Sequence, residues 1–164
     1  MTSQTSSETT IQIATFRLGE EEYAVDISQV QEIVRLSDIT PVPGAPDYVD
    51  GVLNLRGRVV AVMDLARRLG KPSRPRTKAS RIIVTHGAGV TVGMVVDAVT
   101  EVLRLREDAI EPASQLLGSA AAELFKGVGK HEERLLILLD LPKVLSHRDS
   151  QALAAMHQEQ DAHE

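Results

Sequence analysis

The sequence predicts a mainly β protein made of two like halves, each folding as a small barrel. One observation is a repeat in which residues 30–36 return as residues 99–105, 69 positions further along from Val30 to Val99. A second is that Gly51-Val52 and the apolar run at 59–65 return at 127–128 and 135–141, 76 positions later. The third is a series of short apolar stretches with turn residues at intervals of about 8 to 12 positions, a spacing typical of small barrels.

The first half is expected to open with a hairpin, because residues 11–18 alternate loosely and the glycine and glutamates at 19–22 turn the chain. From Ile27 to Val34, apolar residues at helical spacing are followed by β-branched residues at the end of the segment. This pattern predicts a helical turn that leads into a strand. Prolines then force a loop. The expected elements after it are strands at 49–55 and 58–63 around Arg56-Gly57, and a short helix at 65–69 capped by Asp64.

The second half repeats this pattern after a proline-containing connection. Residues 107–124 are expected to be mainly loop, with a helical turn in 119–123. Pro142 indicates a helix start, and residues 151–156 indicate a further helix near the C-terminus. The expected strands of this half are 81–85, 90–96, 99–105, 125–128 and 135–139.

The chain divides into three predicted segments. Residues 1–10 form a disordered N-terminus, residues 11–147 form one domain with halves at roughly 11–70 and 80–147, and residues 148–164 form a helical, polar tail. The connection between the halves carries a basic cluster interleaved with prolines, which indicates a solvated link more than a binding patch. Its members are Lys71, Arg74, Arg76, Lys78 and Arg81.

Composition narrows the function classes. With 164 residues, 43% of them hydrophobic, the chain can bury a core, and a net charge of −5 argues against nucleic acid as the main partner. It has no cysteine, which fits a reducing compartment. The N-terminus lacks a signal peptide pattern, and no apolar stretch approaches the roughly 20 residues that span a bilayer. We therefore expect a cytoplasmic protein without membrane insertion.

No catalytic or metal-binding constellation is found. The five histidines show no ligand spacing, so no metal and no cofactor are expected. The glycines at 87–93 and 127–129 lack the full spacing of nucleotide motifs and are expected to lie in turns. Four aspartates recur with the two halves, which favours capping or turn roles over catalysis. They are Asp26, Asp64, Asp97 and Asp140.

The two copies diverge most at one place. When they are aligned on Asp64 and Asp140, residues 130–133 stand opposite Asn54-Leu55-Arg56-Gly57. Arg56 between apolar strands could lock a loop to a carboxylate or present its planar donor fork to a partner, and the sequence leaves both open.

Several phrases, in order along the chain, resemble the CheW family of chemotaxis coupling proteins. They are residues 18–27 (LGEEEYAVDI), 30–33 (VQEI), 51–57 (GVLNLRG), 92–97 (VGMVVD) and 135–141 (LLILLDL). The resemblance spans about residues 11–147. It implies a non-catalytic adaptor of two interleaved SH3-like, five-stranded β-barrels with short helices and a C-terminal helix, located at membrane-associated receptor arrays.

The resemblance also implies partners and contact residues. The partners would be the cytoplasmic tip of methyl-accepting chemoreceptors, the regulatory domain of the histidine kinase CheA, and other copies of the adaptor in rings. The receptor-contacting positions of the family fall on Ile27, Val30, Glu32, Ile33, Asn54, Arg56, Val99 and Val102. The kinase-contacting positions fall on Leu36, Gly51, Glu111, Gln115 and Leu116.

Other functions stay open at this point. The adaptor could serve a pilus or another non-flagellar pathway, or act as a kinase-free spacer in the array. A small enzyme is disfavoured by the missing catalytic constellation. A barrel that binds a peptide or an oligonucleotide is a third class, since small barrels host many functions.

Overall fold

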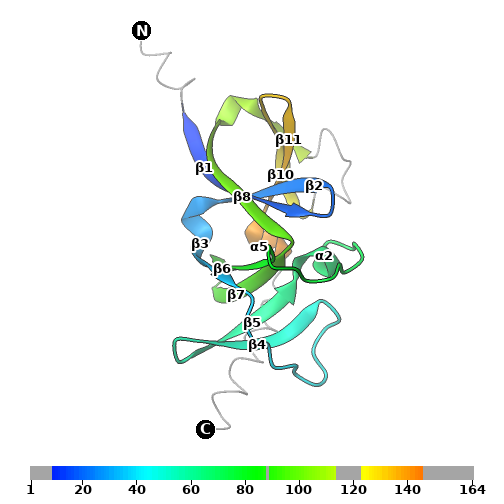
Figure 1. The fold of residues 1–164 in the computed structure, drawn as a ribbon. Coiled ribbons are helices and arrows are strands. Elements are labelled where there is room, and N and C mark those ends of the chain that lie inside the picture. Colours follow the sequence, from blue (N-terminus) through cyan, green and yellow to red (C-terminus); the bar gives the residue numbers. More distant parts are fainter. Residues whose placement is uncertain (1–8, 88, 114–122, 146–164) are drawn as a thin grey trace.

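A computed structural model describes residues 9–87, 89–113 and 123–145 of the chain (Figure 1). The predicted mainly β fold class is confirmed, and the elements match the expected strands closely. In chain order they are β1 (Thr10–Leu18), β2 (Glu21–Asp26), η1 (Ile27–Gln29), β3 (Val30–Arg35), β4 (Val49–Leu55), β5 (Arg58–Asp64), α2 (Leu65–Arg68), β6 (Arg81–Gly87), β7 (Val90–Val96), β8 (Ala98–Arg106), η2 (Glu107–Ala109), β9 (Ile110–Pro112), β10 (Phe125–His131), β11 (Arg134–Leu139) and α5 (Leu141–Val144).

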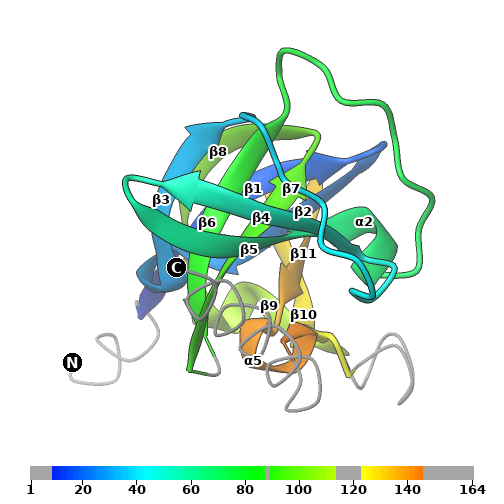
Figure 2. The same ribbon diagram turned by 90° about the horizontal axis from the view of Figure 1, so that it is seen from below.

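The strands form two sheets that lie against each other (Figures 1 and 2). Sheet A has six strands in the order β8-β1-β2-β11-β10-β9, and sheet B has five in the order β3-β6-β7-β5-β4. The sixth strand of sheet A, β9, lies within the stretch expected to be loop. It has three residues and ends in Pro112, so it has too little alternation to be recognised from sequence.

The sheets are equivalent, but each takes strands from both halves of the sequence. The two orders coincide when β3, β6, β7, β5 and β4 are matched with β8, β1, β2, β11 and β10. In each sheet the halves join through a parallel pair, with Tyr23 opposite Ile137 in sheet A and Val92 opposite Ala61 in sheet B. The first hairpin of each half therefore completes the sheet of the other half, and the halves interlock.

Two glycines of the repeat allow another backbone to approach. A Cβ on Gly51 would lie 2.0 Å from the carbonyl oxygen of Thr40, and a Cβ on Gly127 would lie 2.3 Å from that of Glu111. Thr40 bridges Val52 as Glu111 pairs with Val128, so Thr40 is the counterpart of β9 in sheet B. The expectation that residues 127–129 form a turn is wrong, because they lie inside β10.

Packing confirms that the two sheets form one body. The largest buried cluster lies between them and draws on both, including Phe16 and Tyr23 from sheet A and Met63 and Met94 from sheet B. Each sheet also has a smaller buried cluster of its own. The cluster of sheet A contains Ile13, Leu105 and Leu136, and that of sheet B contains Leu53, Val62 and Ile82.

The recurring aspartates have the predicted structural roles. Asp26, Asp64 and Asp140 cap η1, α2 and α5 by accepting backbone N–H groups through their side chains. Asp97 accepts the backbone N–H of Gly19 at 2.7 Å. The predicted helical turn at 119–123 and the C-terminal helix lie outside the described residues, apart from Glu123.

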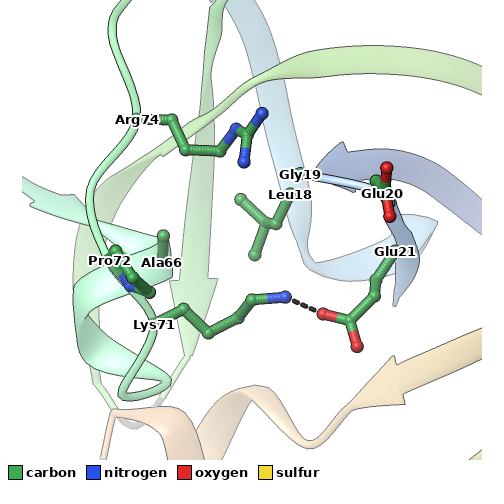
Figure 3. A pocket seen from close by; sticks show the side chains of 8 residues that line it. All are labelled: Leu18, Gly19, Glu20, Glu21, Ala66, Lys71, Pro72 and Arg74. Carbon is green, nitrogen blue, oxygen red and sulfur yellow. Dashed lines mark ion pairs between the residues drawn. The ribbon is translucent and has the colours of Figure 1, made fainter.

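The basic connection is tied to both sheets, which the expectation of a solvated link did not include. The Arg76 guanidinium lies 2.7 Å from Asp50 and 3.2 Å from Asp64. Partial burial of this guanidinium lowers the pKa of Arg76, but the two carboxylates outweigh that effect and raise the pKa above its ordinary value. Lys71 pairs with Glu21, and Arg74 Nε lies 3.5 Å from Asp97. Figure 3 shows Lys71 reaching from the connection to Glu21 beside the turn of the first hairpin. Both basic side chains that line the hollow at this place, Lys71 and Arg74, thus have a carboxylate partner within the chain.

Candidate functional site

Four apolar residues of the repeat lie where the two sheets meet at the surface. We call Val30 and Ile33 on β3, together with Val99 and Val102 on β8, the seam cluster. β3 and β8 are the end strands of their sheets, and they are neighbours in both views (Figures 1 and 2). The repeat relates Val30 to Val99 and Ile33 to Val102, so the cluster is nearly symmetric.

At the seam cluster, the core between the two sheets reaches the surface of the protein. Val30 and Val99 are partly buried against that core, and so is Ile27. Ile33 and Val102 stay 38% and 52% exposed. In register they face Ile83 and Ala14, which are fully buried members of the same core. An exposed apolar strip continuous with a core is a feature of surfaces that bind partners.

A charged hairpin lies next to this seam. Asn54 and Arg56 belong to this hairpin, and together with Glu32 on β3 they are called the hairpin cluster. The Arg56 guanidinium donates to both carboxylate oxygens of Glu32, at 2.8 and 3.2 Å. Arg56 remains 77% exposed, whereas Glu32 is 25% exposed. The structure therefore confirms that Arg56 locks a loop to a carboxylate, while most of its side chain still faces solvent.

The turn that carries Arg56 is a two-residue β-hairpin loop in which both central residues have positive φ. Arg56 and Gly57 have φ of +54° and +84°, and the flanking Leu55 and Arg58 pair in register. The Asn54 side chain accepts the backbone N–H of Gly57 at 3.0 Å. The two clusters adjoin in sequence on β3, where Glu32 and Ile33 are consecutive, and these two side chains point to opposite faces of the strand.

The second half contains a related but tighter charge pair. Glu101, the repeat equivalent of Glu32, accepts from Arg134 at 2.5 Å. Arg134 also donates to Glu22 at 3.1 Å and thereby holds the pKa of Glu22 below its ordinary value. Sequence reasoning missed this pair. Arg134 aligns with Arg58, and the position of Arg56 is taken by Glu132, which shares its left-handed backbone with φ of +57°.

The predicted kinase-contacting residues fall into two regions. Leu36 follows β3 and packs partly against the core of sheet B. Gly51 is buried beneath Thr40, whereas Glu111 is exposed on the edge strand β9. Gly51 is the repeat equivalent of Gly127, whose backbone lies close to the carbonyl oxygen of Glu111. The two regions are therefore the same part of the two sheets. Gln115 and Leu116 lie outside the described residues.

The described residues show no arrangement for chemistry. In this part of the chain no group of three or more His, Cys, Asp or Glu side chains could hold a metal ion. His86 is exposed on its hairpin, with Nδ1 3.0 Å from the Thr91 hydroxyl. None of the helices that the structure describes is long and apolar enough to cross a membrane.

Comparison with known proteins places the chain in a family. Residues 12–149 match the family model described as a CheW-like domain. The chain belongs to the CheW family. It is 38% identical to the chemotaxis protein CheW of Klebsiella aerogenes over 134 residues, which covers 82% of this chain and 81% of that protein. It is 36% identical to CheW of Thermotoga maritima, covering 82% and 87% of the two chains.

The solved structures agree with this assignment. The crystal structure of the scaffolding protein TtCheW from Thermoanaerobacter tengcongensis superposes with a TM-score of 0.78 at 33% identity, over 86% of this chain and 96% of that one. A further relative, Protein PilI of Pseudomonas aeruginosa, is 30% identical over 74% of this chain and 68% of its own length. CheW-family proteins are non-catalytic scaffolds, so this chain is not an enzyme.

Proposed function

We propose that this protein couples methyl-accepting chemoreceptors to the histidine kinase CheA in cytoplasmic, membrane-associated arrays. The observation that carries the proposal is the seam cluster, an exposed apolar strip that both halves of the repeat build together. The CheW relatives of this chain are named chemotaxis proteins, which supports the same class of pathway for this protein.

On the receptor side, the partner would be the helical hairpin at the receptor tip. Such a helix binds by laying an apolar stripe on an apolar surface, while polar residues at the border set its register. Ile33 and Val102 offer the apolar contact, and Arg56 offers a donor fork at one border.

On the kinase side, the regulatory domain of CheA would use the Leu36 and Gly51 region and the Glu111 region. These regions are repeat equivalents on opposite sheets, so a homologous domain can meet each of them in a similar way. Two such contacts on one molecule give head-to-tail assembly, which forms rings when it closes. Copies of this chain could occupy the same rings.

The test is co-sedimentation of the intact chain with a receptor fragment and with the CheA regulatory domain, separately and together. In Arg56→Glu we expect receptor binding to weaken and kinase binding to stay unchanged. The fold should survive, because an exposed ion pair contributes only about 0.2–1 kcal/mol. The matched control is Glu132→Lys, which reverses the charge at the equivalent turn of the other half. Equal receptor binding by Arg56→Glu and wild type would refute the assigned receptor surface.

The relative named PilI supports a second candidate, a coupling protein of a pilus or other non-flagellar pathway. Both candidates predict binding to receptor and kinase, so the discriminating experiment is deletion of the gene followed by separate assays of swimming and surface motility. A third arrangement, the kinase-free spacer, predicts receptor binding without kinase binding in the co-sedimentation experiment.

A further inference from the structure

A basic hollow opens where β3 ends and β6 begins. It has a volume of about 410 Å³ and is lined by Arg35, Leu36, Thr77, Lys78, Ser80 and Arg81. Its lining comes from the end of β3 and from the connection that precedes β6, with Arg81 at the start of β6. The site is separate from the ion pairs that tie Lys71, Arg74 and Arg76 to the sheets.

Two arginines in this hollow face each other across the sheet. Arg35 and Arg81 are direct partners in the antiparallel pair β3–β6, so their side chains leave the same face. Like charges placed directly opposite on neighbouring strands are destabilising. The repeat shows that the fold does not need this pair, because the equivalent residue Arg104 on β8 faces the neutral Gln12.

Nothing in the described part of the chain neutralises this charge. Lys78 adds a third cation, and no carboxylate lines the hollow or pairs with these three side chains among the described residues. Arg81 is held in place because its Nη1 donates to the carbonyl oxygens of Lys78 and Ser80, each at 2.8 Å. Its remaining donors are available for another group. In a chain of net charge −5, three cations in one hollow that no described carboxylate pairs with point to an anionic ligand.

We propose that this hollow binds an acidic peptide segment of a protein partner, with a carboxylate between Arg35 and Arg81 and an apolar neighbour on Leu36. Arginine forks match the planar carboxylate in a bidentate way. Leu36 lines the hollow while packing partly against the core of sheet B, and together with the alkyl stems of the basic side chains it offers apolar surface that a peptide side chain covers and a free phosphate does not. Because Leu36 belongs to the expected kinase surface, the identity of the partner rests on the proposed function, whereas the chemistry of the site does not.

The experiment titrates the intact, isotope-labelled chain with a blocked pentapeptide of alternating glutamate and leucine, followed by NMR. We expect shifts confined to the amides of residues 35–36 and 77–81, and binding that weakens as salt is raised. Arg35→Gln and Lys78→Gln should each weaken binding by roughly two- to fivefold. Arg104→Gln is the matched control and should bind like wild type. The kinase is absent, so this result is independent of whether the proposed function holds.

A second readout uses stability without any ligand. Arg35→Gln removes the facing like charge, so its melting temperature should rise above that of wild type, and the peptide should stabilise wild type more than the variant. Three results would overturn the proposal. These are equal binding of a glutamine-for-glutamate peptide, shifts that avoid residues 35–36 and 77–81, and inorganic phosphate binding as tightly as the peptide, which would assign the site to phosphate.

Discussion

Replacing Gly51 by alanine tests whether this residue serves the architecture of the sheet. Its new Cβ would lie 2.0 Å from Thr40 O and 2.6 Å from Thr40 C, although Cβ atoms essentially never approach heavy atoms within 3.0 Å. Thr40 would have to move by about 1 Å, which breaks its bridge to Val52. Gly51 also has φ of +148°, which alanine rarely adopts.

Two other glycines separate these contributions. Gly44 has φ of +79° and a Cβ added there would meet nothing within 4 Å, so Gly44→Ala isolates the backbone cost of about 1–2 kcal/mol. Gly127 has no positive φ, and its Cβ would lie 2.3 Å from Glu111 O, so Gly127→Ala isolates the close approach at about 1–3 kcal/mol. Gly51→Ala combines both and should lower the free energy of unfolding by about 3 kcal/mol or more.

The assay is urea unfolding of the three variants beside wild type, with equal slopes as the check that only stability has changed. The order of destabilisation should be Gly51→Ala, then Gly127→Ala, then Gly44→Ala or a near tie of the last two. If Gly51→Ala were no less stable than Gly44→Ala, the close approach of Thr40 would not constrain the sheet.

Three further predictions concern the interlocked halves, the charge network and the seam. Fragments 9–76 and 77–145 should each lack strand signal in circular dichroism and regain it on mixing, because both sheets need strands from both fragments. Arg134→Met should lower the free energy of unfolding by about 1–3 kcal/mol at neutral pH. Since Arg134 lowers the pKa of Glu22, the stabilisation is present above the ordinary pKa of Glu22 and disappears as pH falls through the lowered value, so the variant should lose less stability in acid. Ile33→Asp and Val102→Asp should each weaken receptor binding about tenfold in co-sedimentation, whereas Leu135→Asp, at a position 63% exposed on sheet A, should leave it unchanged.

Local patterns were sufficient to predict most strands, the short helical turn before β3 and the helix caps. The alternation at 11–18, the helical turn at 27–29 and the caps at Asp64 and Asp140 depend on neighbours within a few positions, and all are confirmed. Local patterns could not predict the exchange of strands between the halves, which only the family resemblance implied. Pairing of Ala61 with Val92, or Tyr23 with Ile137, is a choice between two equivalent partners that the repeat makes nearly identical.

The site shows the same limit. The repeat indicated that Val30 and Val99 are equivalent, but only the packing of the two sheets shows that both border the core between them. The facing of Arg35 and Arg81 depends on the register of β3 against β6, and the hydrogen bond of Glu32 with Arg56 spans 24 positions. The ties of Arg74 and Arg76 to the sheets were missed for the same reason, since composition alone does not place their carboxylate partners.

The two hairpins show how a duplicated fold acquires two different faces. In the second half, Arg134 lies between two carboxylates and is 32% exposed, so its fork is fully engaged. In the first half the position of Glu22 is taken by Thr91, and among the described residues Glu32 alone pairs with Arg56, which is 77% exposed. A partner carboxylate can therefore compete for Arg56 at the low cost of one exposed ion pair, about 0.2–1 kcal/mol, whereas releasing Arg134 would uncover a carboxylate that is only 12% exposed. By the repeat, the carboxylate introduced in Thr91→Glu would stand beside Arg58, the equivalent of Arg134, so it should hold the first hairpin more tightly and weaken receptor binding without any change at Arg56. Unchanged receptor binding in that variant would show that the freedom of the first hairpin does not limit the contact.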